Sequence, residues 1–257
     1  MKISVCLITL NEERNLPRCF KSVAPLADEI VVIDSGSTDA TVKIARQSGA
    51  RVIQQNWLGY VGQKNFALSQ AAHPWVLSID ADEEISPALA AAITRVKNDP
   101  AAESSNAPNG YQVSRLAYYR GQWIRHGDWY PDRLVRLFRR EEARFTGGRV
   151  HEKLDLPGQH PLLEGDLHHF TYIDPNDRAT RCALYAGLWA QSAHEQGRRA
   201  YAWSPALHSL GRFLRGYFLK GGLLDGAVGW DVAAGNAREV WLKYHRLLEL
   251  NRESSQK

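Results

Sequence analysis

Asp80 and Asp82 are two carboxylates separated by a single residue, Ala81, at the end of an apolar segment. Carboxylates at this spacing can share a hard divalent cation, which prefers oxygen ligands and keeps water or phosphate oxygens in its other positions. Such a cation lowers the free-energy cost of the charge that builds up on a departing diphosphate. Acidic residues just before Ser86 and Pro87 could also form the first turn of a helix. The spacing therefore indicates either a diphosphate site or a helix N-terminus.

Two other apolar segments end in polar residues of a similar kind. The segment Ile3–Thr9 leads into Asn11 and Glu12, and the segment Ile30–Asp34 leads into a turn that contains Gly36. Residues 37–39 can cap the following helix, but capping alone does not explain an aspartate at the end of a strand. Ligands of open parallel sheets bind beyond the carboxyl ends of the strands. We therefore expect the three strand ends to form one site.

Histidines offer a second set of metal-ligating side chains. His168 and His169 are adjacent, and His160 lies nearby in the sequence. Neighbouring residues on a strand point to opposite faces, so a metal site made from these three histidines alone is not expected.

The elements that must position these residues follow an alternating pattern over residues 1–98. Short β-branched segments read as buried strands, and segments of helical period lie between them. The predicted strands are Ile3–Thr9, Ile30–Asp34, Arg51–Gln55 and Trp75–Asp80, and the predicted helices are Leu16–Val23, Thr41–Ser48 and Tyr60–Ala71. This alternation predicts an α/β fold with a mostly parallel, Rossmann-like sheet and helices on both faces.

The pattern changes twice after residue 98. A linker at Asp99–Asn109 precedes shorter predicted strands, and helical period returns near Pro175. The predicted strands are Gly110–Leu116, Gln122–Arg125, Leu134–Arg139 and Arg149–Leu154, and the predicted helices are Arg178–Gln196, Ala206–Leu219 and Val232–Leu250. We expect three parts: the ligand-binding half of a domain at residues 1–98, an α+β second half at 99–174, and a helical C-terminal tail at 175–257.

Composition limits the class of protein. The chain has 257 residues, of which 44% are hydrophobic and 23% are charged, as in globular proteins. Its three cysteines form no CxxC pair, and its N-terminal apolar segment is too short for a signal peptide. No apolar run reaches the roughly 18 residues that a membrane-spanning helix needs. We expect a cytoplasmic protein without a disulfide framework.

Positive charge is concentrated in the tail. Residues 176–257 contain 12 Lys/Arg and 7 Asp/Glu, whereas the net charge of the whole chain is +4. Because the N-terminal part is not basic, nucleic-acid binding is not expected. Arg212, Arg215 and Lys220 alternate with aromatic and aliphatic residues. This pattern predicts either peripheral contact with an anionic membrane or a helix packed on the protein or on a second subunit of a homo-oligomer.

Taken together, these motifs resemble a known family. The series is Thr9, Asn11-Glu12, Asp34-Ser35-Gly36-Ser37-Thr38-Asp39, Lys64-Asn65 and Asp80-Ala81-Asp82. It resembles the nucleotide-sugar-binding half of the family 2 inverting glycosyltransferases with the GT-A fold, over roughly residues 1–100. Three later segments resemble the lipopolysaccharide core β-1,4-glucosyltransferases of the WaaE/KdtX type: Arg136–Arg139, Val150-His151-Glu152 and Tyr217–Gly222.

The resemblance implies a role for each matching residue. Thr9, Asn11, Glu12, Asp34 and Gly36 would line the nucleoside pocket, although Ser35 stands where many members have a second acidic residue. Lys64 and Asn65 would lie beside the ribose and the diphosphate. Asp80 and Ala81 would approach the ribose, and Asp82, with Asp80, would hold Mg²⁺ or Mn²⁺.

Inverting transfer also needs a general base that takes the proton of the acceptor hydroxyl. Glu152 is our expected base, with Asp132 and Asp128 as rivals. His151 could contact the metal or the diphosphate, and Trp129 could stack on a sugar face. Simpler interpretations remain open for each: an exposed carboxylate, a structural histidine and turn residues.

The function predicted from these features is transfer of a hexose from a nucleotide diphosphate sugar to a saccharide hydroxyl. The resemblance favours UDP-glucose as donor and the lipopolysaccharide inner core, a glycolipid, as acceptor, at the cytoplasmic face of the inner membrane. One alternative is a transferase that acts on polyprenyl phosphate. Another is a sugar-nucleotide-binding protein without catalysis.

Overall fold

The computed structural model describes residues 1–104, 107–147, 152–172 and 175–255. The chain forms two compact units. The first comprises residues 1–115 and 132–169, and the second comprises residues 116–131 and 170–257. The β-hairpin at residues 116–131 thus belongs with the C-terminal helices, which the sequence pattern did not suggest.

The first unit is built on a parallel sheet of four strands. Strand β1 (Ile3–Thr9) lies between β2 (Glu29–Asp34) and β4 (Trp75–Ser78), and β3 (Arg51–Gln54) pairs with β2. The three central strands are almost fully buried, as their β-branched and aromatic residues predict. The expected α/β fold with a parallel sheet is confirmed for this half of the unit.

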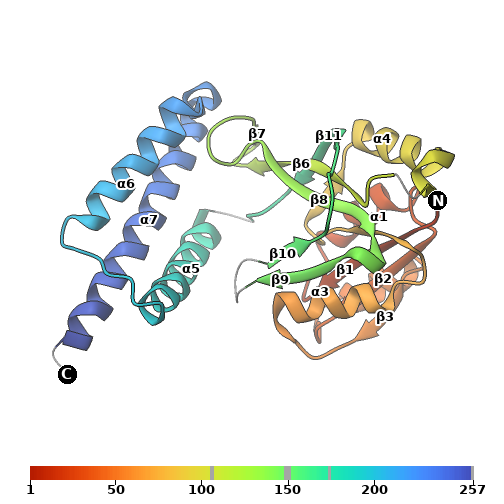
Figure 1. Ribbon diagram of the computed structural model, residues 1–257, viewed down its shortest axis with the longest axis horizontal. Helices are drawn as coiled ribbons and strands as arrows, with labels where there is room; N and C mark the ends of the chain where they lie inside the picture. The colour runs from red at the N-terminus through yellow and green to blue at the C-terminus, as the bar shows by residue number, and fades with distance from the viewer. Residues whose placement is uncertain (105–106, 148–151, 173–174, 256–257) are drawn as a thin grey trace. The chain divides into compact units, whose positions relative to one another are not determined.

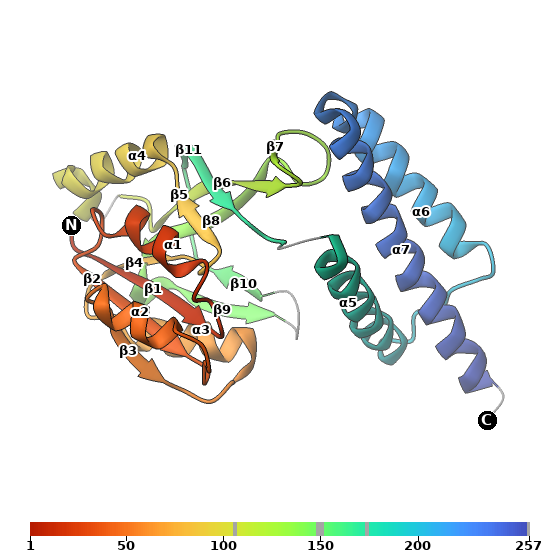
Figure 2. The same cartoon turned by 180° about the vertical axis from the view of Figure 1, so that it is seen from behind.

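Helices cover both faces of this sheet, as expected (Figures 1 and 2). Side chains of α1 (Leu16–Val23), α2 (Thr41–Gln47) and α4 (Pro87–Asn98) share one core with Ile3, Val5 and Leu7 of β1. Helix α3 (Gly59–Gln70) packs Ala67 and Leu68 in a second core with Cys6, Val31 and Ile33. Successive residues of β1 therefore face opposite cores, which fixes the register of the strand.

The remaining strands extend the sheet in the antiparallel sense. The strand order is β3-β2-β1-β4-β8-β6-β11-β5, so the sheet is mixed beyond β4. The added strands are β8 (Asp132–Arg139), β6 (Gly110–Tyr119), β11 (Leu162–His169) and β5 (Glu83–Ile85), while β9 (Arg144–Gly147) and β10 (Glu152–Asp155) form a separate pair. Short 3-10 turns lie at Pro100–Glu103 (η1) and Arg140–Glu142 (η2).

The sequence pattern missed three of these strands. Strand β5 has only three residues, and β9 and β11 carry too few apolar residues to stand out. The predicted strand Arg149–Leu154 begins at Glu152 in the structure, and residues 149–151 lie outside the described part of the chain.

The second unit combines the hairpin with C-terminal helices. Strand β7 (Gln122–Ile124) pairs with Ala117–Tyr119 at the end of β6. The helical segments are α5 (Pro175–Glu195), α6 (Ser204–Leu214), the π-helical turn η3 (Arg215–Leu219), the 3-10 turn η4 (Gly222–Asp225) and α7 (Gly226–Ser255). Helix α7 packs against α5 and α6. Among the described residues, every helix is too short or too polar to cross a bilayer.

Gly165 lets β11 approach the start of α4. Its φ is +95°, and a Cβ there would lie 2.3 Å from the backbone nitrogen of Leu89. Gly158 has a similar φ of +98°, but its Cβ would meet nothing within 4 Å. A comparison of alanine substitutions at the two glycines therefore separates the cost of a positive φ from the cost of steric overlap with the backbone.

We predict that Gly165→Ala lowers the free energy of unfolding by about 3 kcal/mol or more, because backbone atoms must move apart. Gly158→Ala should cost about 1 kcal/mol, from the positive φ alone. Urea titration followed by circular dichroism measures both. Equal losses for the two variants would contradict the close approach of β11 and α4.

Candidate active site

The carboxyl end of β2 forms a closed hydrogen-bonded turn. Asp34 is fully buried and accepts hydrogen bonds from Thr9 Oγ1 (3.1 Å) and from the backbone N–H groups of Gly36 (3.1 Å) and Ser37 (2.9 Å). Gly36 has φ +95°, a conformation that glycine adopts readily. Asp34 thus joins the end of β1 to the turn after β2.

The loop after β1 is held against the same turn. The Asn11 N–H donates to Ser37 Oγ (2.9 Å), and the Asn11 side chain accepts from the Thr38 N–H (2.9 Å). The Glu12 N–H donates to Thr41 Oγ1 (2.7 Å). The structure therefore brings together five of the residues predicted to line a nucleoside pocket: Thr9, Asn11, Glu12, Asp34 and Gly36.

A polar cleft opens beside this turn. It has a volume of about 270 Å³ and is lined by Asp34, Gly36, Gln54, Gln55 and Asn56, at the carboxyl ends of β2 and β3. Backbone groups and amide side chains at this rim can donate and accept hydrogen bonds, as a nucleobase or ribose requires. The glutamines and Asn56 were not expected from the sequence, because amides without a motif give no signal.

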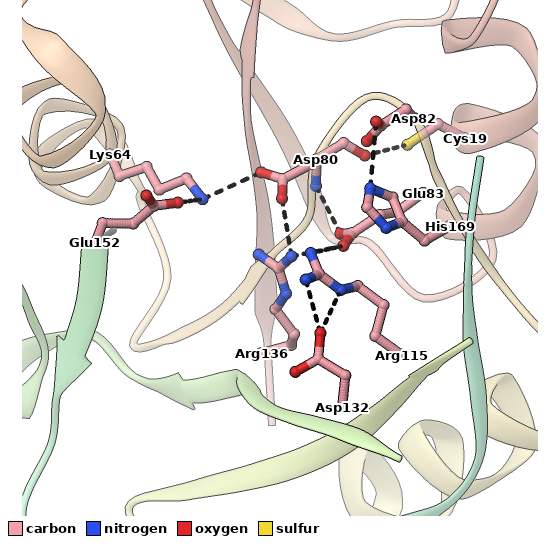
Figure 3. A network of polar contacts seen from close by, with 10 residues as sticks. All are labelled: Cys19, Lys64, Asp80, Asp82, Glu83, Arg115, Asp132, Arg136, Glu152 and His169. Atoms are coloured by element: carbon pink, nitrogen blue, oxygen red, sulfur yellow. Dashed lines mark hydrogen bonds and ion pairs between the residues drawn. The ribbon is translucent and has the colours of Figure 1, made fainter. Parts of the chain in front are cut away.

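At the end of β4, two cations hold Asp80 (Figure 3). Asp80 Oδ1 lies 3.2 Å from Lys64 Nζ, and Asp80 Oδ2 lies 2.8 Å from a terminal nitrogen of Arg136. The side chains of Lys64, from α3, and Arg136, from β8, are each only 7% exposed. Ala81 is buried beside them. Two elements far apart in the sequence thus supply the positive charge for one carboxylate.

Glu83 extends this cluster. Its side chain is fully buried, receives a hydrogen bond from Arg136 (2.6 Å) and accepts another from the backbone N–H of Asp80 (2.9 Å). Arg115 lies 3.6 Å from Glu83 and pairs with Asp132 at 2.7 Å. Asp132, one of the predicted bases, is therefore already bound by a guanidinium.

The two carboxylates respond differently to this environment. Burial alone would raise the pKa of Asp80, but Arg136 and Lys64 reverse that effect and hold its pKa well below the usual range. Burial also raises the pKa of Glu83, Asp80 raises it further, and Arg136 lowers it, so that the net shift is upward. The charges of Glu83 and Asp80 raise the pKa of Arg136, although burial opposes this. Arg136 is therefore the charge on which both carboxylates depend.

Asp82 faces a histidine that sequence reasoning did not connect with it. Asp82 Oδ2 lies 3.3 Å from Nε2 of His169, at the end of β11. This pair supplies one oxygen and one nitrogen, both of which ligate divalent cations. Among residues placed by the structure, no cluster of three or more acidic, histidine or cysteine side chains forms a complete metal site. The pair fits a cation whose remaining ligands come from water and a diphosphate.

Glu152, the predicted base, lies at the start of β10. Its Oε1 accepts a hydrogen bond from Lys64 Nζ at 2.7 Å, so that one ammonium group contacts both Asp80 and Glu152. The neighbouring residue His151 lies outside the described residues. Asn65 has a structural partner: its side chain donates to the carbonyl of Phe145 (2.8 Å) and accepts from the N–H of Phe145 (2.9 Å). It holds β9 against α3.

Two other predicted residues belong to the second unit. Trp129 donates from Nε1 to Asn236 Oδ1 (3.2 Å) and packs on Tyr119. The Asp128 side chain is 2% exposed, with Arg212 and Lys220 both at 3.0 Å. Within this unit, both residues connect the hairpin to the C-terminal helices.

The sequence held partial signals for the residues that were missed. Arg136 interrupts the apolar strand Leu134–Phe138, and a charge in such a strand needs a buried partner. Glu83 directly follows the Asp80-Ala81-Asp82 motif. Only the fold shows that β8 and β11 bring Arg136 and His169 to the end of β4.

Comparisons with known proteins bear on this site. A model of the family described as glycosyl transferase family 2 matches residues 4–153. An uncharacterized glycosyltransferase of Rickettsia typhi is 32% identical over 98% of this chain and 89% of its own length. The lipopolysaccharide core biosynthesis glycosyltransferase LpsC of Rhizobium meliloti is 32% identical over 86% of this chain and 82% of its own length.

One solved structure can be set beside these relatives. The glucosyl-3-phosphoglycerate synthase of Mycobacterium tuberculosis, in complex with Mn²⁺, UDP and phosphoglyceric acid, is 28% identical. The match covers 47% of this chain and 44% of that chain, with a TM-score of 0.35.

We predict that Arg136→Met lowers the free energy of unfolding at pH 7 by about 3–5 kcal/mol, because it leaves the fully buried Glu83 and the partly buried Asp80 without their shared cation. In the variant the charge of Arg136 no longer lowers the pKa of Asp80 and Glu83, so both carboxylates protonate more readily and the loss should shrink as the pH falls. Arg133→Met, at an exposed position on the same strand, should change stability by about 0.5 kcal/mol or less. A loss that does not vary with pH would contradict the charge-based explanation.

Proposed function

This chain belongs to glycosyltransferase family 2, and from that membership we propose that it transfers a hexose from a nucleotide diphosphate sugar to a saccharide hydroxyl of a lipopolysaccharide inner core. The observation that carries the proposal is the placement of Asp34, Asp80 and Asp82 at the carboxyl ends of β2 and β4, on either side of β1. Ligands of such sheets bind at this edge.

The donor is proposed to lie across this edge. The polar cleft beside Asp34 would take the nucleoside, and the diphosphate would extend toward Asp80 and Asp82. Lys64 carries a positive charge at that end of the site. UDP-glucose is the donor that we propose, on the strength of the resemblance in sequence to core glucosyltransferases.

Asp82 and His169 would hold the divalent cation, Mg²⁺ or Mn²⁺. When bound, the cation would offset the negative charge that develops on the leaving diphosphate. Asp80 would lie beside the cation, and Lys64 and Arg136 hold both oxygens of the Asp80 carboxylate in place. This assignment differs from the expectation that Asp80 and Asp82 share the ion, because Asp80 already has two cationic partners.

Glu152 is the base that we propose. Glu152 accepts a hydrogen bond from Lys64, which also contacts Asp80 at the proposed donor end of the site, whereas Asp132 accepts two hydrogen bonds from Arg115. The Lys64 ammonium orients the Glu152 carboxylate, which would accept the proton of the attacking hydroxyl. No covalent intermediate is needed.

The acceptor is proposed to be a glycolipid at the cytoplasmic face of the inner membrane. The relative LpsC is named for lipopolysaccharide core biosynthesis, which supports this substrate class. The basic and aromatic C-terminal segment supports peripheral contact with an anionic membrane.

We predict that UDP-glucose together with Mn²⁺ raises the melting temperature, because a ligand that binds only the folded state stabilises it by about 2.7 kcal/mol at one hundred times its Kd. Asp82→Asn should abolish the part of the shift that depends on the metal. Asp155→Asn, an exposed carboxylate at the end of β10, is the matched control. Differential scanning fluorimetry with several sugar nucleotides measures the shifts. An unchanged metal-dependent shift in Asp82→Asn would remove Asp82 from the cation site.

We predict that Glu152→Gln lowers kcat by about 10²–10⁴-fold with little change in the KM for the donor, since the amide keeps the contact with Lys64 but cannot take a proton. Glu164→Gln, an exposed residue of β11, should leave the rate unchanged. Transfer assays with purified core acceptor give both constants. Full activity of Glu152→Gln would favour the polyprenyl phosphate alternative, whose acceptor is already ionised. Donor binding without transfer would favour a non-catalytic protein.

A further inference from the structure

The second unit exposes a run of large apolar side chains on one continuous segment. Leu207, Leu210 and Leu214 recur at three- and four-residue spacing on α6 and therefore share a face. Five further large apolar side chains are exposed in the segment that follows: Phe218, Leu219, Leu223, Leu224 and Trp230. Leu219 is 84% exposed and Leu224 is 66% exposed. We call these eight residues the apolar belt.

The belt has a defined shape because its backbone is closely packed. A Cβ on Gly229 would lie 1.9 Å from the carbonyl oxygen of Gly222, and a Cβ on Gly222 would lie 2.7 Å from that of Gly216. Trp230 also packs on Phe213 and Tyr217, with ring centroids 4.8 and 5.3 Å apart. The exposed side chains therefore project from a fixed support.

The segment that carries the belt also carries positive charge. Arg212, Arg215 and Lys220 gather around the buried carboxylate of Asp128, at distances of 3.0, 3.9 and 3.0 Å. One carboxylate facing three cations leaves a local surplus of positive charge, and the three cations remain 35%, 55% and 40% exposed. Asp225 is the only acidic residue in the sequence from 200 to 230, and its side chain is 7% exposed.

We propose that the apolar belt inserts into the interface of an anionic phospholipid bilayer, with Arg212, Arg215 and Lys220 contacting the phosphate groups of the lipids. The proposal extends the membrane contact of the proposed function to named residues. A segment that carries exposed leucines, aromatic rings and partly exposed cations matches the two layers of a bilayer surface. The apolar side chains suit the acyl chains, and the cations suit the anionic phosphates. A second copy of the chain fits less well, because a symmetric contact would bring two positive clusters together.

The test measures how much of the full chain sediments with vesicles. Anionic vesicles of phosphatidylcholine containing phosphatidylglycerol are compared with neutral vesicles of pure phosphatidylcholine. The wild type should bind the anionic vesicles more tightly. Leu219→Ser/Leu224→Ser should lower the partition coefficient about tenfold or more, since two exposed leucines lose their transfer into the interface. Leu184→Ser, an exposed leucine of α5 outside the belt, is the control and should bind like the wild type.

The charge contribution is tested with Arg215→Gln, which removes the most exposed of the three cations and the one farthest from Asp128. Binding should fall about fivefold at low ionic strength, and the difference should narrow as salt is added. Arg246→Gln is the control, because Arg246 lies sixteen residues beyond Trp230 on α7, about 24 Å along the helix. The tryptophan emission of the chain, to which Trp230 contributes, should shift to shorter wavelength on anionic vesicles.

Three results would overturn the proposal: equal binding of the wild type to neutral and anionic vesicles, unchanged binding of the double leucine variant, or a dimer in solution that this variant dissociates. The last result would assign the belt to a second copy. Circular dichroism of each variant confirms folding. Because sedimentation requires neither donor nor turnover, an active enzyme that ignores vesicles would contradict only this proposal. An inactive protein that binds them would contradict only the proposed function.

Discussion

The site depends on the compensation of buried negative charge at the end of β4. The fully buried Glu83 and Asp80, whose side chain is 29% exposed, stand close together, and both stay in place because Arg136 binds them and Lys64 and Arg115 add further positive charge. Removing a charge from water is unfavourable unless a partner replaces the lost hydration. The antiparallel strands β6 and β8 carry Arg115 and Arg136 and therefore supply the positive charge that stabilises the acidic residues at the end of β4.

This arrangement also joins the two ends of the site. Lys64 contacts Asp80 on the donor side and Glu152 on the proposed acceptor side, and Asn65, its neighbour on α3, fixes β9 next to them. A change in the position of one carboxylate must alter the surroundings of the other. The geometry thus gives a physical link between the proposed donor site and the orientation of Glu152, the proposed base.

Much of the first half of the fold could be predicted from the sequence because it is built from local patterns. Strands β1 to β4 and helices α1 to α3 follow from short β-branched segments alternating with segments of helical period. Strands β5, β9 and β11 could not be predicted, because their pairing partners are distant and their own side chains are largely polar. Arg136 and His169 could not be predicted as site residues for the same reason, because distant strand pairing brings them to the site. The adjacency of His168 and His169 in the sequence gave no indication that His169 faces Asp82.

A crystal structure of the chain with UDP and Mn²⁺ tests the central claim most directly. The account predicts that the uracil and ribose occupy the cleft beside Asp34 and that the ion lies between the diphosphate and the side chains of Asp82 and His169, with Asp80 still bound to Arg136. Density for the nucleotide on another surface, or an ion held away from Asp82, would contradict it.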